Sequence, residues 1–172
     1  MGSHTDKTTR QLNKLLELDN VVPVAFRSSL ILEGSEAIER EIQRCLSEEE
    51  KLINEGKNPV VYTERQVISL PDDTREKALK RSTAISECLL QMVKRLSVEP
   101  SFVVAKGGIT SADVGVKALA IRKARVAGQI QPGVPVWIAD ENSKFPDIPY
   151  VIFPGNVGDD ETLYNAVKTL IG

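Results

Sequence analysis

The sequence contains few of the residues that disulfide frameworks, metal clusters and membrane spans require. Its 172 residues include two cysteines and one histidine, too few for a disulfide framework or a zinc cluster built from cysteine. Cys45 and Cys88 lie on the apolar side of helix-like stretches, which is typical of small buried thiols in a reduced compartment. No apolar run approaches the roughly 20 residues of a membrane span. Residues 1–10 lack the apolar centre of a signal peptide, so we expect a cytoplasmic protein without a metal cluster.

A surplus of charge of either sign is absent as well. Lysine and arginine together number 22, and aspartate and glutamate 24, which gives a net charge of −2 at pH 7. Proteins that bind nucleic acids or anionic membranes carry a basic excess, so neither partner is expected. Hydrophobic residues make up 41% of the chain, which suffices for a core without cross-links. The length predicts a single domain over residues 1–172.

Short apolar runs alternate with longer amphipathic stretches along the whole chain. Strands are predicted at 21–26, 60–62, 102–105, 126–130, 134–138 and 149–153. Helices are predicted at 6–18, 34–55, 71–96, 110–124 and 159–170. Strands that alternate with helices imply crossover units, in which helices cover both faces of parallel strands. The expected fold is therefore α/β and Rossmann-like, with a mainly parallel sheet.

Several polar or aromatic residues have simple structural explanations. Asp72 and Asp73 open a predicted helix, where acids favour the helix dipole, so capping explains them better than paired catalysis. The sole histidine, His4, lies near the start of the chain, and Trp137 is expected to fill core. The irregular stretch 139–148 is either a flap or a surface loop. These residues offer no general acid–base pair.

A glycine-bearing loop, residues 106–111, lies between a predicted strand and a predicted helix. Gly107 and Gly108 let the backbone approach a ligand closely, and the helix start presents unpaired N–H groups to an anion. Thr110 and Ser111 add hydroxyls and Lys106 a charge, so phosphate is the ligand that suits the loop best. The alternative is a tight turn in which Thr110 caps the helix through a Thr110-x-x-Asp113 box. The spacing leaves both interpretations open.

A second such loop, residues 154–159, also leaves a strand and enters a helix. Ligands of parallel sheets bind outside the carboxyl ends of the strands, so the two loops could converge on one ligand. The alternative makes Gly155 and Asn156 turn residues and Asp159 a helix cap. Neither loop is a Walker A sequence or a GxGxxG fingerprint.

Three stretches that include these loops together resemble one known family. Residues 102–111 (FVVAKGGITS), 128–137 (GQIQPGVPVW) and 150–159 (YVIFPGNVGD) resemble the C-terminal nucleotide-binding domain of the four-carbon acid sugar kinases. They occur in the family's order and spacing. Gly2-Ser3, followed by Thr8-Thr9 and Gln11-Leu12, is similar to the Gly-Ser loop that opens that domain. The resemblance covers nearly the whole chain.

The resemblance implies an activity and a set of ATP contacts. Family members use ATP to phosphorylate small acid sugars such as D-threonate, D-erythronate and 3-oxo-tetronates. The family's ATP contacts fall here on Ser3, Gly107, Gly108, Ile109, Thr110, Gly155 and Asn156. Lys106 and Mg²⁺ are the expected neutralisers of the transferred phosphate, and ATP or ADP is the expected ligand. A homodimer is compatible with the sequence.

The chain departs from the family in one respect. The family's enzymes also have an N-terminal domain with an Asp-Asp-x-Thr-Gly-Ala signature that binds the acid sugar. Here Asp72-Asp73-Thr74 is followed by Arg75-Glu76, which is no match. The 172 residues therefore resemble the C-terminal half of a two-domain kinase, and we expect them to bind nucleotide weakly and to catalyse little alone.

Three other functions stay open on the sequence. A non-catalytic nucleotide-binding or regulatory module would need the same loops as the kinase. A dinucleotide-binding oxidoreductase domain lacks support, because no GxGxxG motif opens the first unit. An interaction protein would use the glycine loops only as turns.

Overall fold

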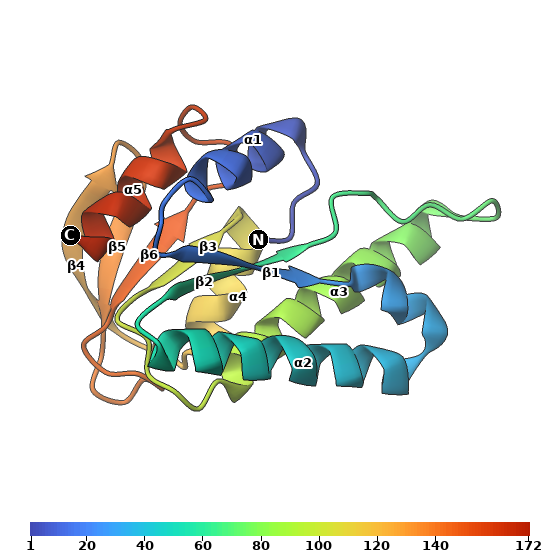
Figure 1. The fold of residues 1–172 in the computed structure, drawn as a ribbon, viewed down its shortest axis with the longest axis horizontal. Helices are drawn as coiled ribbons and strands as arrows, with labels where there is room; N and C mark the ends of the chain where they lie inside the picture. The colour runs from blue at the N-terminus through green and yellow to red at the C-terminus, as the bar shows by residue number, and fades with distance from the viewer.

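The computed structural model describes residues 1–107 and 110–172 in full, and of residues 108 and 109 the helical backbone alone. Helices and strands alternate along the chain, as Figure 1 shows. The helices are α1 (Asp6–Leu15), α2 (Ser35–Asn54), α3 (Arg75–Arg95), α4 (Gly108–Asp113) and α5 (Thr162–Ile171), with shorter helical turns at Ser28–Glu33 and Val114–Ala118. The strands are β1 (Val21–Phe26), β2 (Asn58–Thr63), β3 (Val103–Lys106), β4 (Ala124–Gln131), β5 (Val134–Ala139) and β6 (Pro149–Phe153). The predicted α/β class is confirmed.

Within the described residues, the strands form two hydrogen-bonded sheets. One is the parallel pair β1–β2, and the other has the order β3–β6–β5–β4. β3 and β6 are parallel, whereas β5 is antiparallel to both β6 and β4. The antiparallel pairing of β4 with β5 follows from the short turn between them, because a parallel pair needs a crossover of a dozen or more residues. The parallel strands thus carry an antiparallel edge, as in many doubly wound folds.

The helices form two groups on opposite faces of the sheets. α1 and α5 lie together on one face, and α2, α3 and α4 lie on the other (Figure 1). The first group buries Leu15 and Leu163 against Val151 and Phe153 of β6. Each helix therefore presents one apolar stripe to a sheet, which is the arrangement that an amphipathic repeat of about 3.6 residues produces. Of the described helices, none is long and apolar enough to cross a membrane.

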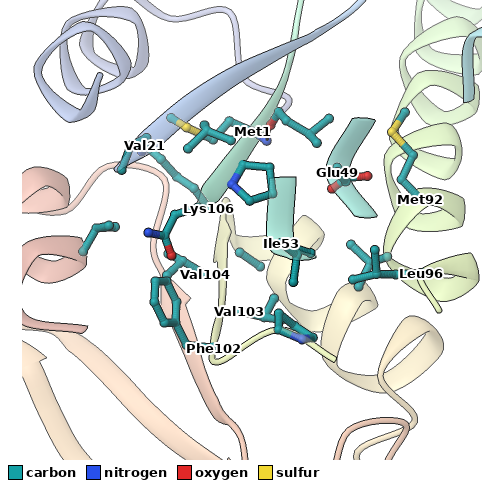
Figure 2. Close-up of a pocket in the computed structure, with 18 of the residues that line it drawn as sticks. Met1, Val21, Glu49, Ile53, Met92, Leu96, Phe102, Val103, Val104 and Lys106 are labelled. Atoms are coloured by element: carbon teal, nitrogen blue, oxygen red, sulfur yellow. Dashed lines mark hydrogen bonds between the residues drawn. The ribbon is translucent and has the colours of Figure 1, made fainter. Parts of the chain in front are cut away.

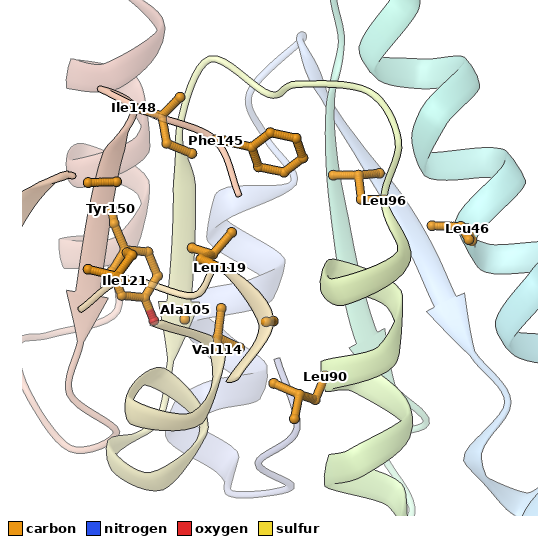
Figure 3. Close-up of a cluster of buried hydrophobic side chains, with 12 residues drawn as sticks. Leu46, Leu90, Leu96, Ala105, Val114, Leu119, Ile121, Phe145, Ile148 and Tyr150 are labelled. Carbon is orange, nitrogen blue, oxygen red and sulfur yellow. The ribbon is translucent and has the colours of Figure 1, made fainter. Parts of the chain in front are cut away.

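A second core cluster lies under α3 and α4 and includes side chains from residues 139–148. Their burial shows whether this stretch is a flap or a surface loop. Phe145 and Ile148 of that stretch are 6% and 5% exposed and pack beside Leu119 and Tyr150 (Figure 3). Two anchoring side chains of this size make it a packed surface loop rather than a flap. The predicted core role of Trp137 holds in part, because its ring is half-buried and meets the Tyr150 ring edge-on at 6.5 Å.

The start of α3 differs from the prediction. The helix begins at Arg75 rather than Pro71, and Thr74 is its N-cap, accepting the Lys77 N–H at 3.2 Å. Asp73 instead forms an ion pair with Arg81, and Asp72 pairs with Lys77. The prediction that the two aspartates cap the helix was therefore wrong. Threonine is itself a good cap, and the carboxylates are held by cations within reach.

The helix after β3 is also different from the predicted 110–124. α4 begins at Gly108 and continues as a π-helical turn to Ala118, and β4 has begun by Ala124. The alternative Thr110–Asp113 capping box does not form. Gly107 is the N-cap, and Asp113 pairs with Lys117 at 2.9 Å. The cysteine prediction holds, since Cys45 and Cys88 are both buried free thiols.

Candidate functional site

The loops that follow β3 and β6 meet at one edge of the sheet. Because these strands are parallel neighbours, their carboxyl ends point the same way. The Gly107 N–H donates to the Phe153 carbonyl at 2.9 Å. A Cβ atom built on Gly155 would lie 3.8 Å from the Gly107 Cα atom. The two glycine loops therefore converge, as the sequence predicted, and glycine keeps the gap between them narrow.

Lys106, the last residue of β3, connects the two glycine loops through a hydrogen bond from its side chain. Its side chain is 3% exposed, and its ammonium donates to the Gly155 carbonyl at 3.1 Å and lies 5.0 Å from the centre of the Phe153 ring. Among the described residues, no carboxylate lies within ion-pair distance of this ammonium. Burial, with a smaller contribution from Lys7, lowers the pKa of Lys106 to about 8. An anion bound nearby would compensate this buried charge.

Helix α1 brings a second lysine to the same edge. Lys7, in the first turn of α1, donates to the Asn156 carbonyl at 2.9 Å. Gln11, one helical turn later, donates to the Asp159 carbonyl at 2.7 Å. These bonds dock the start of α1 onto the loop that follows β6. The start of α1 thus joins the two glycine loops, and Lys7 brings a positive charge to the Asn156 backbone.

A third cation, Arg65, follows β2 by two residues. Its Nε and Nη2 atoms donate to the Thr9 hydroxyl at 3.2 and 2.9 Å. Its Nη1 atom is buried without a hydrogen-bond partner among the described residues. A buried N–H without an acceptor is costly, so an anionic ligand would stabilise this arrangement. Burial lowers the pKa of Arg65, but a guanidinium stays charged in proteins.

The predicted residues of the first two loops are placed as follows. Ser3 is half-buried, and its hydroxyl contacts the Thr5 hydroxyl at 3.3 Å. Gly107 has a φ of +123°, a conformation that favours glycine, and a Cβ atom there would lie 3.4 Å from the Thr110 hydroxyl. Thr110 is half-buried, whereas Ser111 is 2% exposed. The side-chain positions of Gly108 and Ile109 lie outside the described residues.

The loop after β6 begins with residues that are exposed or half-buried and ends with Asp159, whose carboxylate is hydrogen-bonded. Asn156 is exposed, and Gly155 is half-buried beside Gly107. Asp159 lies just before α5 and accepts the Glu161 N–H at 3.1 Å and the Thr162 hydroxyl at 2.7 Å. The N-cap of α5 is Glu161, and no side chain among the described residues caps the helix, so the alternative in which Asp159 is a helix cap was wrong. Asp159 instead closes the turn that precedes α5. Gly155 and Asn156 are left facing the other loops.

Sequence reasoning missed Lys7 and Arg65. Each had a usable signal, since Arg65 follows a predicted strand just as Lys106 ends one, and Lys7 opens the helix after the Gly-Ser pair. Together with Lys106 they bring three cations to one edge of the sheets, near glycine-lined backbone. Among the described residues, no group of three His, Cys, Asp or Glu side chains could hold a metal ion. The edge is suited to a polyanion, and phosphate is the chemistry it fits best.

The comparison with protein-family models gives one match. The family described as "Nucleotide-binding C-terminal domain" matches residues 1–163, which is nearly the whole chain. A search of curated proteins found no match. The family match agrees with the resemblance drawn from the loops and with the polyanion site.

Several solved structures share the fold. A protein of Salmonella typhimurium LT2, provisionally named a tRNA synthase, aligns with a TM-score of 0.72 and 19% identity. A Haemophilus influenzae protein aligns with a TM-score of 0.66 and 22% identity. A Bordetella bronchiseptica protein, described as a domain of unknown function in a domain-swapped dimer with bound citrate, aligns with a TM-score of 0.65 and 16% identity. Each alignment covers 98% of this chain and 39% of the other, so this chain spans about two fifths of those proteins.

Proposed function

Since this chain belongs to the nucleotide-binding C-terminal domain family, which confirms its resemblance to that domain of the four-carbon acid sugar kinases, we propose that it binds the phosphates of ATP or ADP where its strand ends converge. As part of a complete kinase, it would present the γ-phosphate of ATP to a hydroxyl of a threonate-, erythronate- or oxo-tetronate-type sugar acid. The observation that carries the proposal is the meeting of Gly107, Gly155 and three cations at one edge.

The three cations differ in position, and each would therefore act on the phosphates in a different way. Lys7 is half-buried, and its ammonium donates to the Asn156 backbone carbonyl, a bond that it can exchange for one to a phosphate at little cost. Arg65 offers a guanidinium nitrogen that has no acceptor within the described part of the chain. Lys106 is buried under the Gly155 carbonyl and would act through the field it places beneath the phosphates. Phosphoryl transfer depends mostly on positioning and charge neutralisation, which is what this edge supplies.

The loops contribute the neutral half of the site. Gly107 and Gly155 leave room for a phosphate to approach the backbone, and the hydroxyls of Ser3 and Thr110 can donate hydrogen bonds. The Gly108–Ile109 backbone and the Asn156 amide complete the predicted contacts. The same proposal assigns Ser111 a supporting position, because its hydroxyl is almost fully buried.

We expect Mg²⁺ to reach this site bound to the phosphates of the nucleotide, and not through carboxylates of this chain. The carboxylates that follow Gly158 are already engaged, Asp159 with Thr162 and Asp160 with Arg10. Mg²⁺ keeps several waters and is commonly held by substrate phosphates with one or two carboxylates. When bound with ATP it would neutralise phosphate charge, and we assign none of the described side chains to it.

The acid sugar and the phosphoryl acceptor belong to the wider proposal. This chain spans about two fifths of the solved proteins it matches, so a kinase would need a second domain to bind the sugar. A non-catalytic nucleotide sensor would use the same edge of the sheets. Adding an acid-sugar-binding domain of this family in trans, with ATP and threonate, separates the two: phosphothreonate formation supports the kinase. A homodimer belongs to the same proposal, and light scattering checks it.

Calorimetric titration of the chain with ADP, ATP and NAD tests the nucleotide site. We expect ADP and ATP to bind and NAD to bind more weakly. Lys7→Ala should weaken ADP binding about tenfold, the loss of one charged hydrogen bond of about 1.4 kcal/mol. Lys14→Ala, on the same helix but paired with Glu17, is the matched control and should leave the affinity unchanged. Equal affinities in the two variants, or no binding by the folded chain, would contradict the proposal.

A further inference from the structure

A cavity of about 260 Å³ separates the two sheets. Its walls come mainly from the facing strands, with Val60 and Val61 of β2 on one side and Val103 and Val104 of β3 on the other. Side chains of α2, α3 and α5 close it above and below, and Figure 2 shows Glu49, Ile53 and Met92 among them. The cavity is therefore a mainly apolar space between the facing edges of β2 and β3, which belong to different sheets.

Met1 already lies in a strand position at the end of this cavity. Its amino group donates to the Val61 carbonyl at 2.6 Å, and its carbonyl accepts the Thr63 N–H at 3.1 Å. One residue that bonds to positions j−1 and j+1 of its neighbour is the pattern of a parallel ladder. Met1 is thus paired in parallel with β2, opposite Tyr62, on the edge that β1 does not use.

The facing backbone groups are arranged for such a ladder. Since Thr63 points its N–H toward Met1, alternation points the backbone groups of Val61 and the carbonyl of Pro59 toward the same side. On β3, Gly107 bonds to β6, so alternation turns the backbone groups of Val104 toward the cavity. Pro59 has no N–H and can only accept. A small apolar molecule would leave these backbone groups without partners, whereas an extended peptide would pair with both edges.

The charges at the end of the cavity suit an amide better than an ammonium. Burial lowers the pKa of the Met1 amino group to about 5, with Arg65 and Lys106 adding to the effect and Glu49 opposing it. One carboxylate oxygen of Glu49, which lines the same cavity, is buried without a hydrogen-bond partner among the described residues. A peptide bond at the Met1 nitrogen would replace a buried ionisable amino group with a neutral amide and keep the hydrogen bond to the Val61 carbonyl.

We propose that this cavity is an acceptor site for one more parallel β-strand, an extended apolar segment joined to Met1 by a peptide bond and running between β2 and β3. Residues 58–61 of β2 precede the level of Met1, so the segment would fill the space with about four residues, or ~13 Å at 3.3 Å per residue. Both faces of such a strand would be covered by helices, which calls for Val- or Ile-rich sequence. The two sheets would become one, and the Gly2–Ser3 loop would leave a strand as the other loops do. Lys106 and Thr110 line this cavity as well as the proposed nucleotide site, but the strand proposal does not rest on nucleotide binding.

The test compares three forms of the chain that differ only before Met1. One carries four Val and Ile residues, one carries four Gly and Ser residues, and one has no extension. The apolar form should have a Tm at least about 5 °C above the other two, and the amide hydrogens of Val61 and Val104 should exchange at least about tenfold more slowly. A Val/Ile extension with proline two residues before Met1, where the N–H would face the Pro59 carbonyl, should lose part of the gain.

Other occupants give different results. Equal Tm values and equal exchange at Val61 and Val104 in all three forms would overturn the proposal. Protection of Val61 in the unextended chain that grows with protein concentration would assign the site to a second copy and also overturn it. A failure of ADP to bind any of the forms would leave these stability and exchange results unchanged, so the two proposals are tested separately.

Discussion

A basic residue stands at the end of β3 and another just after β2, but the two differ in their hydrogen-bond partners. β3 ends in Lys106, whose ammonium has the Gly155 carbonyl as a partner because β6 lies alongside β3. β2 is followed by Arg65, whose Nη1 atom is buried without a partner among the described residues. The β2 edge that faces β3 exchanges backbone hydrogen bonds with Met1 instead of with a neighbouring strand. The comparison teaches that strand pairing decides whether a basic residue at a strand end is held by the fold or left for a ligand.

The largest effect should come from Glu49, in the cavity beside the unpaired β2 edge. Burial raises the pKa of Glu49 to about 8 from its ordinary 4.5, while the Met1 ammonium opposes this shift. A carboxyl group whose pKa is raised on folding costs stability as pH rises from 4.5 to 8, because the folded state must hold the proton or bury the charge. Glu49→Gln should therefore gain stability relative to the parent, by about 2–4 kcal/mol between pH 5 and pH 9.

Urea unfolding of both proteins at pH 5 and pH 9 measures that difference. Glu48→Gln, one position earlier on the exposed side of α2 and paired with Arg44, is the matched control. A Glu49→Gln effect that is the same at both pH values would show that the carboxyl group of Glu49 is not desolvated in the folded state.

Gly158 tests the region where β3 is paired with β6, because it lies in the loop between β6 and α5. It has a φ of +71°, and a Cβ atom there would lie 2.2 Å from the Thr162 hydroxyl oxygen. Gly158→Ala should lower the free energy of unfolding by about 2 kcal/mol, from backbone strain and the displaced Thr162 side chain. The matched control is Gly128→Ala, which has a φ of +135° and no atom within 4 Å of the added methyl group.

Differential scanning calorimetry separates these two costs, since ~2 kcal/mol corresponds to a Tm decrease of about 4–8 °C. If both glycine variants lose the same Tm, backbone strain alone explains the effect, and Thr162 does not hold the β6 loop in place.

Arg65 should matter for ligand binding more than for stability. Arg65→Gln removes the bonds to the Thr9 hydroxyl, but it also removes an Nη1 atom that is buried without a partner among the described residues. Because these two effects on stability oppose each other, the Tm should change little, whereas ADP binding should weaken about tenfold, or about 1.4 kcal/mol. Arg75→Gln, at the exposed start of α3, is the control for the loss of one positive charge. An Arg65→Gln variant that binds ADP with the parent affinity would remove Arg65 from the site.

The smallest expected effect is a proton taken up at Lys106. Its pKa is lowered to about 8, so part of the population is neutral at pH 8 to 9, and a bound polyanion would raise that pKa. ADP binding at pH 8.5 should therefore take up a fraction of a proton, which appears as a dependence of the binding enthalpy on the ionisation enthalpy of the buffer. Lys106→Met should abolish this dependence, and its persistence in that variant would assign the proton to another group.

Much of the fold followed from local patterns, and the site only in part. The strands 21–26 and 149–153 were predicted at their observed bounds, because their apolar runs end at turn-forming residues. The helix start at Arg75 was missed because proline is common at the first position of a helix, which made Pro71 the expected start. The Asp73–Arg81 ion pair, which holds residues 71–74 outside the helix, is visible only in the structure.

Long-range contacts explain what the sequence could not show about the site. The glycine loops were found because a strand, a glycine and a helix follow one another in the sequence. Lys7 and Arg65 were not, because their neighbours, Asn156 and Thr9, come from other segments. The division of the strands into two sheets depends on which edges pair, and apolar patterns do not encode that pairing.

The most direct test of the account is amide hydrogen exchange of the chain with and without ADP, with adenosine as the comparison ligand. We predict that ADP, but not adenosine, slows exchange in the loops that follow β3 and β6 and at the start of α1, because phosphates bound where these loops converge would cover their N–H groups. Protection by ADP elsewhere in the chain, with these three loops unchanged, would contradict the placement of the phosphate site.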